Sequence, residues 1–336
     1  MDPVPHQQIT FAKWLRKLQG TMLQGALGRA VCEADIHQID RELHLFVPPQ
    51  YLSRLAGFGL RGELLFPVPS IVKQNPALAG YYRLVVGLSK KECERYPELK
   101  RFSALEPVVD GDEGDGRPEA AVTDEDVDNL CRTLTSAACS LLDELEDLTA
   151  AFLHELTLLT LGAQFRGSYN NIVGRQASGV IFQSMREILV PRSREVIRDE
   201  PGLLVIRNAS GREVSVRLGA DPDILVSEEV TEGTRTQVLS VEVKGGKDRS
   251  NIHNRLGEAE KTHLKCKESG ALECWTVVGV EELSLPEAKR ESPTTNRFFL
   301  LRDITSRTPA SEEFARHLVA RVGVPFVLER SAGDEG

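Results

Sequence analysis

Two acidic residues and one lysine in the second half of the chain have types and spacing that suit a metal-dependent reaction on phosphate. Asp223 follows Pro222 at the start of one predicted strand, and Glu242 and Lys244 lie on another. Alternate residues of a strand point to one face, so Glu242 and Lys244 point the same way, and Asp223 joins them if the strands are neighbours. Two carboxylates with a main-chain carbonyl, for which Val243 is the candidate, suit Mg²⁺, which takes hard oxygen ligands and keeps several waters.

The set predicts phosphodiester hydrolysis at a site of the PD-(D/E)xK type. A bound metal lowers the pKa of water and stabilises the charge that grows on a phosphate, while Lys244 orients the attacking water. Glu-x-Lys alone is weak evidence, because it recurs at 98–100 and 287–289 and is commonly a solvated ion pair on a strand edge. Pro-Asp occurs once, and the combination of both patterns on predicted strands is what favours a site.

A charged cluster follows the strand within five residues of Lys244. Lysine and arginine read guanine O6 and N7 in the major groove, and aspartate accepts a hydrogen bond from cytosine N4. Lys247, Asp248 and Arg249 therefore suit the reading of a G·C pair, although a charged surface turn is the alternative. Asn251 and Arg255 open the next predicted helix, where polar side chains and backbone amides can meet DNA phosphates.

Several segments resemble the XcyI-type restriction endonucleases, and the likeness extends over nearly the whole chain. The most specific part spans residues 219–263, and the segments are GADPDI, VEVKGGKDRSNIHNRLGEAEKTH, ECWTVVG, LGAQFRGSYNNIVG, FAKWL and GYYRLVVGLS. The resemblance implies a type II enzyme of a restriction-modification system, a homodimer that uses Mg²⁺ to cut both strands of double-stranded DNA. It also implies the target CCCGGG, cut after the first C to leave 5′ overhangs.

By the same resemblance, Asp223, Glu242 and Lys244 match the family's catalytic set. The segment 247–249 is similar to the R-(D/E)-R element of CCGG-reading relatives, with lysine in its first position. Many enzymes of this fold use a further carboxylate from a preceding helix, for which Glu187 is the first candidate and Asp221 the second. Glu187 paired with arginines on a helix surface is the alternative, and Asp221 is expected to share a strand face with Asp223.

The pattern of elements predicts an α/β fold with three regions. We expect a mostly helical region over residues 1–107, an acidic linker over 108–123, and a core of the restriction-endonuclease type over 124–330 with a central mixed sheet flanked by helices. The predicted helices cover 7–45, about 124–161, 180–190, 252–269 and 311–323. The predicted strands include a hairpin that turns at 208–211, two strands around 221–244, and strands at 272–280 and 296–304. His263 is expected to be solvated on its helix, and Trp275 to lie in the core.

Composition and charge set limits on function. The net charge is −9, yet residues 105–148 alone carry fourteen acidic residues and two arginines, so the rest of the chain has a net charge of +3 and can present a basic groove. No apolar run approaches the roughly 20 residues of a membrane span, and the N-terminus lacks the pattern of a secretory signal. The six cysteines lack metal spacing and read as reduced thiols, so we expect a cytoplasmic protein.

Two alternatives to a site-specific endonuclease stay open on the sequence. A structure-specific or repair nuclease would keep the fold and the catalytic residues but would need no base-reading cluster. A non-catalytic DNA-binding protein would use Asp223, Glu242 and Lys244 as a structural ion-pair group. End sequencing of plasmid cleaved with Mg²⁺ separates the three, since they predict discrete fragments, a smear and no cleavage respectively.

Overall fold

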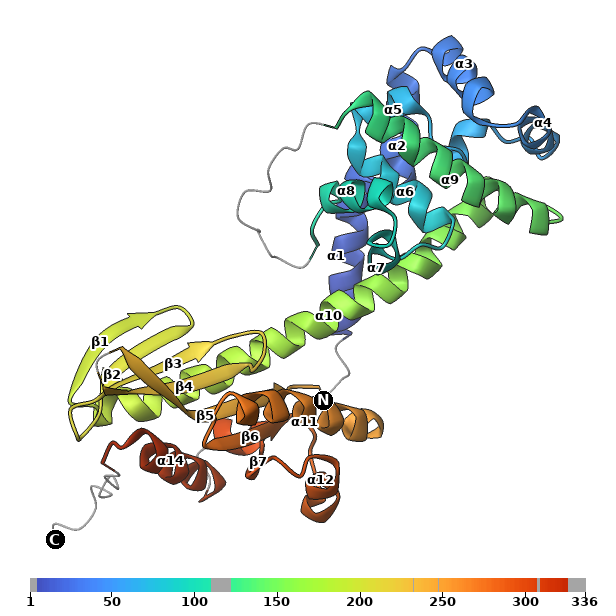
Figure 1. Cartoon of the computed structure of the whole chain (residues 1–336). Coiled ribbons are helices and arrows are strands. Elements are labelled where there is room, and N and C mark those ends of the chain that lie inside the picture. Colours follow the sequence, from blue (N-terminus) through green and yellow to red (C-terminus); the bar gives the residue numbers. More distant parts are fainter. Residues whose placement is uncertain (1–4, 110–121, 232, 247, 307–308, 326–336) are drawn as a thin grey trace, which may run out of the picture. The chain divides into compact units, whose positions relative to one another are not determined.

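The computed structural model describes residues 5–109, 122–231, 233–246, 248–306 and 309–325. Lys247 and most of the predicted acidic linker therefore lie outside the described residues. The chain divides into two compact units between Tyr169 and Asn170 (Figure 1). None of the described helices is long and apolar enough to cross a bilayer. All six cysteines are free thiols, as the sequence predicts.

The first unit is helical, as predicted. Its apolar core includes Phe66, Tyr81, Tyr82 and Phe102. The region predicted as one helix over 7–45 is three helices, because the chain turns after Thr21 and again after Glu33. The helices are α1 (His6–Thr21), α2 (Gln24–Glu33), α3 (Ile36–Phe46), α4 (Pro49–Gly57), α5 (Pro69–Gln74), α6 (Ala79–Val85), α7 (Lys90–Cys93), α8 (Pro97–Leu105) and α9 (Asp124–Glu144).

Helix α9 packs in the first unit, whereas the sequence places the start of the core at residue 124. Its predicted capping box is present, with the Thr123 side chain accepting from the Asp126 N–H and Asp126 accepting from the Thr123 N–H. Leu130 and Leu134 lie in the apolar core of the N-terminal helices. Burial of this face places α9 in the first compact unit. The second unit begins later, at Asn170, and not at residue 124.

The polar, glycine-rich stretch 162–179 does not interrupt the helix there. Helix α10 runs continuously from Ala150 to Leu189, and a 3₁₀ turn at Val190–Arg192 ends it where Pro191 was expected to stop it. Each half has its own packing partners. Phe165 contacts Trp14 in the first unit, with ring centroids 5.3 Å apart, and Ile181 and Met185 enter the core of the second. Such packing outweighs a helix-propensity cost of about 1 kcal/mol per glycine.

The second unit is built on one seven-stranded mixed sheet, whose strands lie in sequence order. Strands β1 to β5 pair antiparallel, and β5, β6 and β7 pair parallel. The strands are β1 (Glu195–Glu200), β2 (Leu203–Arg207), β3 (Glu213–Leu218), β4 (Ile224–Thr231), β5 (Thr234–Lys244), β6 (Glu273–Val278) and β7 (Arg297–Leu300). The helices are α11 (Ile252–Glu268), α12 (Leu285–Glu291), α13 (Leu301–Thr305) and α14 (Pro309–Val322).

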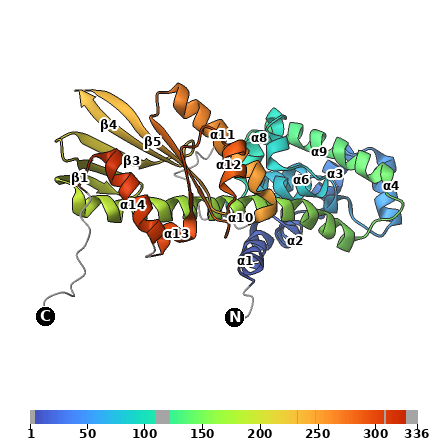
Figure 2. The ribbon, with the colours of Figure 1, turned by 90° about the horizontal axis from the view of Figure 1, so that it is seen from below.

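Different helices pack on the two faces of this sheet. Alternate residues such as Val214, Val226 and Val241 enter one apolar core with the C-terminal half of α10 and with α14. Helix α11 lies on the opposite face, over β5 and β6, where Ser240 contacts Cys266 (Figure 2). Trp275 is fully buried, as expected. The segment predicted as a strand at 296–304 is strand β7 followed directly by α13.

Candidate active site

The pairing of β4 with β5 brings Asp223 beside the Glu242–Lys244 strand end, as the sequence predicts. Ile224 pairs with Val241 in the antiparallel register, which places Asp223 one step beyond the last pair. The Val243 N–H donates to Asp223 Oδ2 at 2.7 Å. Ser178 Oγ, from α10, donates to Asp223 Oδ1 at 3.1 Å. Asp223 is therefore held between the backbone of β5 and α10.

A tight turn fixes the approach to Asp223. The Gly219 N–H donates to the Asp223 carbonyl at 2.9 Å, which closes the segment that contains Pro222. A Cβ at Gly219 would come within 2.8 Å of the Pro222 carbonyl oxygen. Only glycine therefore fits this position without a shift of the backbone.

Lys244 lies between two carboxylates. Its Nζ donates to Glu242 Oε1 at 2.9 Å and lies 3.6 Å from Glu258 Oε2. Glu242 and Lys244 both point toward α11, which confirms their predicted common face. Glu258 belongs to α11 and was missed by the sequence analysis, because no pattern links it to a strand fourteen residues earlier. Its place on the face of a following helix needs the tertiary structure.

Burial controls the ionisation of this group. It raises the pKa of Asp223, although the hydrogen bonds from Val243 and Ser178 oppose the change. Burial also raises the pKa of Glu242, against the attraction of Lys244. For Lys244, burial alone would lower the pKa, but the carboxylates around it raise it above its ordinary value. Lys244 is thus a cation at neutral pH, while the two acids ionise less readily than exposed carboxyls.

One oxygen of this group fits a missing ligand. Glu242 Oε2 is buried and has no hydrogen-bond partner, an arrangement that is costly for a carboxylate unless a cation or water meets it. Within the described residues no three acidic, histidine or cysteine side chains converge on one point. Mg²⁺ needs no such cage, because it is commonly held by one or two carboxylates and keeps water in its other positions. Asp223 and Glu242 meet that requirement.

The structure does not bring Glu187 to this group. Glu187 is exposed, accepts a hydrogen bond from Gln183 at 3.0 Å, and lines a groove between α10, α13 and α14. It follows Ser178 by nine residues, which at 3.6 residues per turn places it on the opposite side of α10. Asp221 does not share partners with Asp223 either. It pairs with Lys265 of α11 at 2.7 Å, whereas Asp223 contacts α10 and β5.

The described residues of the predicted reading segment are exposed beyond the end of β5. Asp248 Oδ1 accepts from the Ser250 N–H at 2.9 Å and caps the 3₁₀ turn Arg249–Asn251. Arg249 has 77% of its side chain exposed and lies 3.5 Å from Glu282. Asn251 accepts from Asn254 at 2.9 Å, at the start of α11. The segment has the exposure that contact with DNA requires.

Two glycines fix the base of this segment. A Cβ on Gly245 would collide with Ala177 of α10, and a Cβ on Gly279, after β6, would collide with the Gly245 backbone. The Gly279 N–H also donates to the Lys244 carbonyl at 2.8 Å. The chain is thus held on both sides as it leaves Lys244.

Arg255 lies directly over Gly246. A Cβ on Gly246 would overlap the Arg255 guanidinium, so the glycine makes room for the arginine. Arg255 is also close enough to Asp248 to lower the pKa of that carboxyl, after the larger effect of hydrogen bonds from Ser250. The side chain is half-buried and lies over Gly246, two residues after Lys244.

His263 is buried, so the expectation of a solvated histidine is wrong. Its Nε2 lies 2.9 Å from Thr276 Oγ1, in a polar group that continues through Thr295 and Ser292 to Glu260. Burial lowers the pKa of His263 to about 4, so the ring is neutral at pH 7. Thr276 pairs in register with Glu242, so this polar group lies beside the strand that carries Glu242 and Lys244.

Comparison with known proteins is consistent with this geometry. A family model described as XcyI restriction endonuclease matches residues 12–325. The chain is 39% identical over 328 residues to the type II restriction enzyme Cfr9I of Citrobacter freundii, and the match covers 96% of both chains. It is equally similar, over the same length and coverage, to the type II restriction enzyme XcyI of Xanthomonas campestris pv. cyanopsidis.

Proposed function

Because this chain belongs to the XcyI restriction endonuclease family and is a type II restriction endonuclease, we propose that it cuts DNA at a PD-(D/E)xK site formed by Asp223, Glu242 and Lys244. The observation that carries the assignment is the hydrogen bond from Val243 to Asp223, which joins the Pro-Asp turn to the Glu-x-Lys strand. Two patterns that are weak alone meet at one strand end, and this supports the proposed site.

Asp223 and Glu242 are the proposed ligands of Mg²⁺, together with the main-chain carbonyl of Val243. The N–H and C=O of a strand residue point to the same side, so the Val243 carbonyl faces the Asp223 side as its N–H does. When bound, Mg²⁺ supplies a Lewis acid that stabilises negative charge on the phosphate oxygens and favours deprotonation of water. The unpartnered Glu242 Oε2 is the atom that supports this role best.

Lys244 then positions the attacking water and stabilises charge on the phosphate. The water oxygen attacks phosphorus in line, the bond to the 3′-oxygen breaks, and the products carry a 5′-phosphate and a 3′-hydroxyl. Glu242 and Glu258 hold the ammonium from two sides. Glu258 takes the place, in this proposal, of the additional carboxylate that was sought at Glu187.

The exposed segment is proposed to read the target, which we take to be CCCGGG cut after the first C to leave 5′ overhangs. Arg249 and Arg255 each have the chemistry to bind guanine, and Asp248 to accept from cytosine. Asn251 is proposed to contact a phosphate, and Lys247 to contact a base or a phosphate. A palindrome is cut in both strands by two copies related by a twofold axis, so a homodimer is proposed. An enzyme with this substrate must meet DNA inside the cell, and the cytoplasm is the proposed location.

End sequencing of digested plasmid tests the proposal. The protein is incubated with plasmid and Mg²⁺, with EDTA as the control, and the fragment ends are sequenced. Discrete fragments that all begin with CCGGG support the proposed target and overhang. Discrete ends of another sequence would replace the target and keep the site, and a smear would indicate a structure-specific nuclease. No cleavage with Mg²⁺ would remove the proposed catalytic role.

A further inference from the structure

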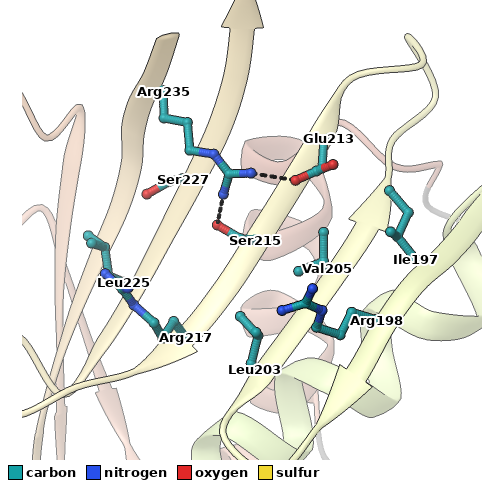
Figure 3. Close-up of a pocket in the computed structure, with 10 residues that line it drawn as sticks. All are labelled: Ile197, Arg198, Leu203, Val205, Glu213, Ser215, Arg217, Leu225, Ser227 and Arg235. Carbon is teal, nitrogen blue, oxygen red and sulfur yellow. Dashed lines mark hydrogen bonds and ion pairs between the residues drawn. The ribbon is translucent and has the colours of Figure 1, made fainter. Parts of the chain in front are cut away.

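A hollow of about 380 Å³ lies on the exposed part of the sheet, over β1 to β5 (Figure 3). Leu225 lines it and pairs across the strands with both Ser240 and Arg217. Cross-strand partners share a face of the sheet, and Ser240 contacts α11. The hollow is therefore on the same face as Glu242 and Lys244, beside α11. The residues that line it are Ile197, Arg198, Leu203, Val205, Glu213, Ser215, Arg217, Leu225, Ser227 and Arg235.

Three arginines and one glutamate line this hollow, which gives it an excess of positive charge in an acidic protein. Arg235 is occupied, since it donates to Glu213 and to Ser215 (Figure 3). Arg198 has only a long contact of 3.7 Å with Glu200, and both side chains are more than half exposed. Arg217 is exposed, and no carboxylate of the described chain pairs with it. Two guanidinium groups are therefore available to an anion.

The position of Arg217 relative to the catalytic strand follows from the register. Arg217 faces Leu225, and Leu225 faces Ser240, two residues before Glu242. Two strand spacings across the sheet and two residues along it amount to about 12 Å. Each strand of B-DNA carries one phosphate per about 3.4 Å of helix axis, and successive phosphates are also rotated around that axis, so this separation corresponds to about two nucleotide steps along one strand.

We propose that this hollow is a second DNA contact, in which Arg217 binds a backbone phosphate about two steps from the bond that is cut and Arg198, two strands further out, binds a more distant one. The proposal rests on the proposed place of cleavage at Glu242 and Lys244. The apolar floor of the hollow, formed by Leu203, Val205 and Leu225, offers no hydrogen-bond donors that distinguish bases. The contact thus adds affinity without regard to sequence and orients the duplex across the sheet.

A double-mutant cycle tests the proposal: Arg217→Ala is combined with neutralisation of single phosphates in the DNA. Duplexes that contain the target carry one neutral methylphosphonate each, placed in turn along both strands. Wild type should lose about threefold to tenfold in kcat/KM when a phosphate about two steps from the cut is neutral, and Arg217→Ala should lose nothing further there. The slope of log binding constant against log salt concentration should be smaller in magnitude by about one unit for Arg217→Ala than for wild type.

Two further variants control the experiment. Arg217→Lys keeps the charge and should retain the salt slope. Arg302→Ala, an exposed arginine of α13 beside Asp303, should behave as wild type. Two results would overturn the proposal. One is an equal salt slope for wild type and Arg217→Ala, and the other is a loss in kcat/KM from Arg217→Ala that adds to the loss from every neutralised phosphate. The arginines would then be surface groups without a role in DNA binding. Failure of wild type to cut the unmodified duplex would instead overturn the proposed function, and the same cycle measured by binding affinity would still decide the role of Arg217.

Discussion

The strand end proposed for catalysis and the segment proposed to read DNA are adjacent in sequence but differ in almost every physical respect. Glu242 is buried, and Lys244 is held by two carboxylates at the end of a central strand. Arg249, five residues later, lies largely in solvent with a single long ion pair. Chemistry needs groups fixed in a dry environment, whereas reading a duplex needs side chains that reach outward. Strand β5 ends at Lys244, between the buried groups and the exposed segment.

Lys244→Ala should produce the largest effect. It should reduce cleavage and leave the binding of target DNA unchanged. We expect a loss of about a thousandfold or more in the cleavage rate, since a charge-stabilising group is removed from the reacting phosphate. Specific binding should persist, because the reading segment is unchanged. Single-turnover cleavage and binding to target DNA measure the two quantities.

Lys100→Ala is the matched control, because Lys100 ends another Glu-x-Lys sequence but lies exposed within helix α8 and not on a strand. It should cut at the wild-type rate. Cleavage by Lys244→Ala at that same rate would show that the assignment of Lys244 is wrong.

Arg249→Ala and Arg255→Ala test the reading side. A bidentate contact to guanine contributes about 1–3 kcal/mol of discrimination at one base pair, so each variant that removes one should relax the target at a single position. The measurement is kcat/KM on the target and on duplexes with each single base-pair change. An equal loss on target and random DNA would make the arginine a phosphate contact instead.

Glu258→Gln should have a smaller effect, of about tenfold on the cleavage rate. The variant removes one of the two carboxylates that hold Lys244, and a less well positioned group loses rate. Binding to target DNA should be unchanged, and Glu268→Gln on the same helix is the control. A wild-type rate would mean that the 3.6 Å contact is an exposed ion pair of little consequence.

Asp223→Asn should abolish cleavage yet slightly stabilise the protein in the absence of Mg²⁺. Burial raises the pKa of Asp223 above 3.8, so ionisation of this group favours the unfolded state. The gain in melting temperature should be present at pH 7.5 and should vanish as the pH falls below about 3.8, where the carboxyl is protonated in both states. Thermal unfolding of both proteins at several pH values measures it, and a lower melting temperature at pH 7.5 would contradict it.

The main elements and the proximity of Asp223, Glu242 and Lys244 were predictable because their signals are local. Alternation around Val241 and Val243 marks β5, and the turn at 208–211 marks the β2–β3 hairpin. Strand β1 was missed because its sequence, EVIRDE, is polar and exposed along its whole length. The continuity of α10 was missed because packing of Phe165 and Ile181 overrides a local pattern of glycines and polar residues.

The remaining parts of the site depend on contacts between elements that are distant in sequence. Ser178 reaches Asp223 from a helix forty-five residues earlier, and Glu258 reaches Lys244 from the helix that follows. A glutamate on a helix surface has the same local sequence whether it faces solvent or a lysine. For that reason the sequence analysis named Glu187 as its first candidate and did not single out Glu258, and only the turn of α10 places Glu187 on the side away from Ser178.

The glycine contacts at the base of the reading segment have a consequence for the evolution of new targets. Gly245 is confined between Ala177 and Gly279, so the path of the chain is set before the exposed turn begins. Residues after Gly246 can therefore change without displacing Lys244. Selection for a new target can explore sequence and length in this turn, and in the opening of α11, while the cutting machinery is inherited intact.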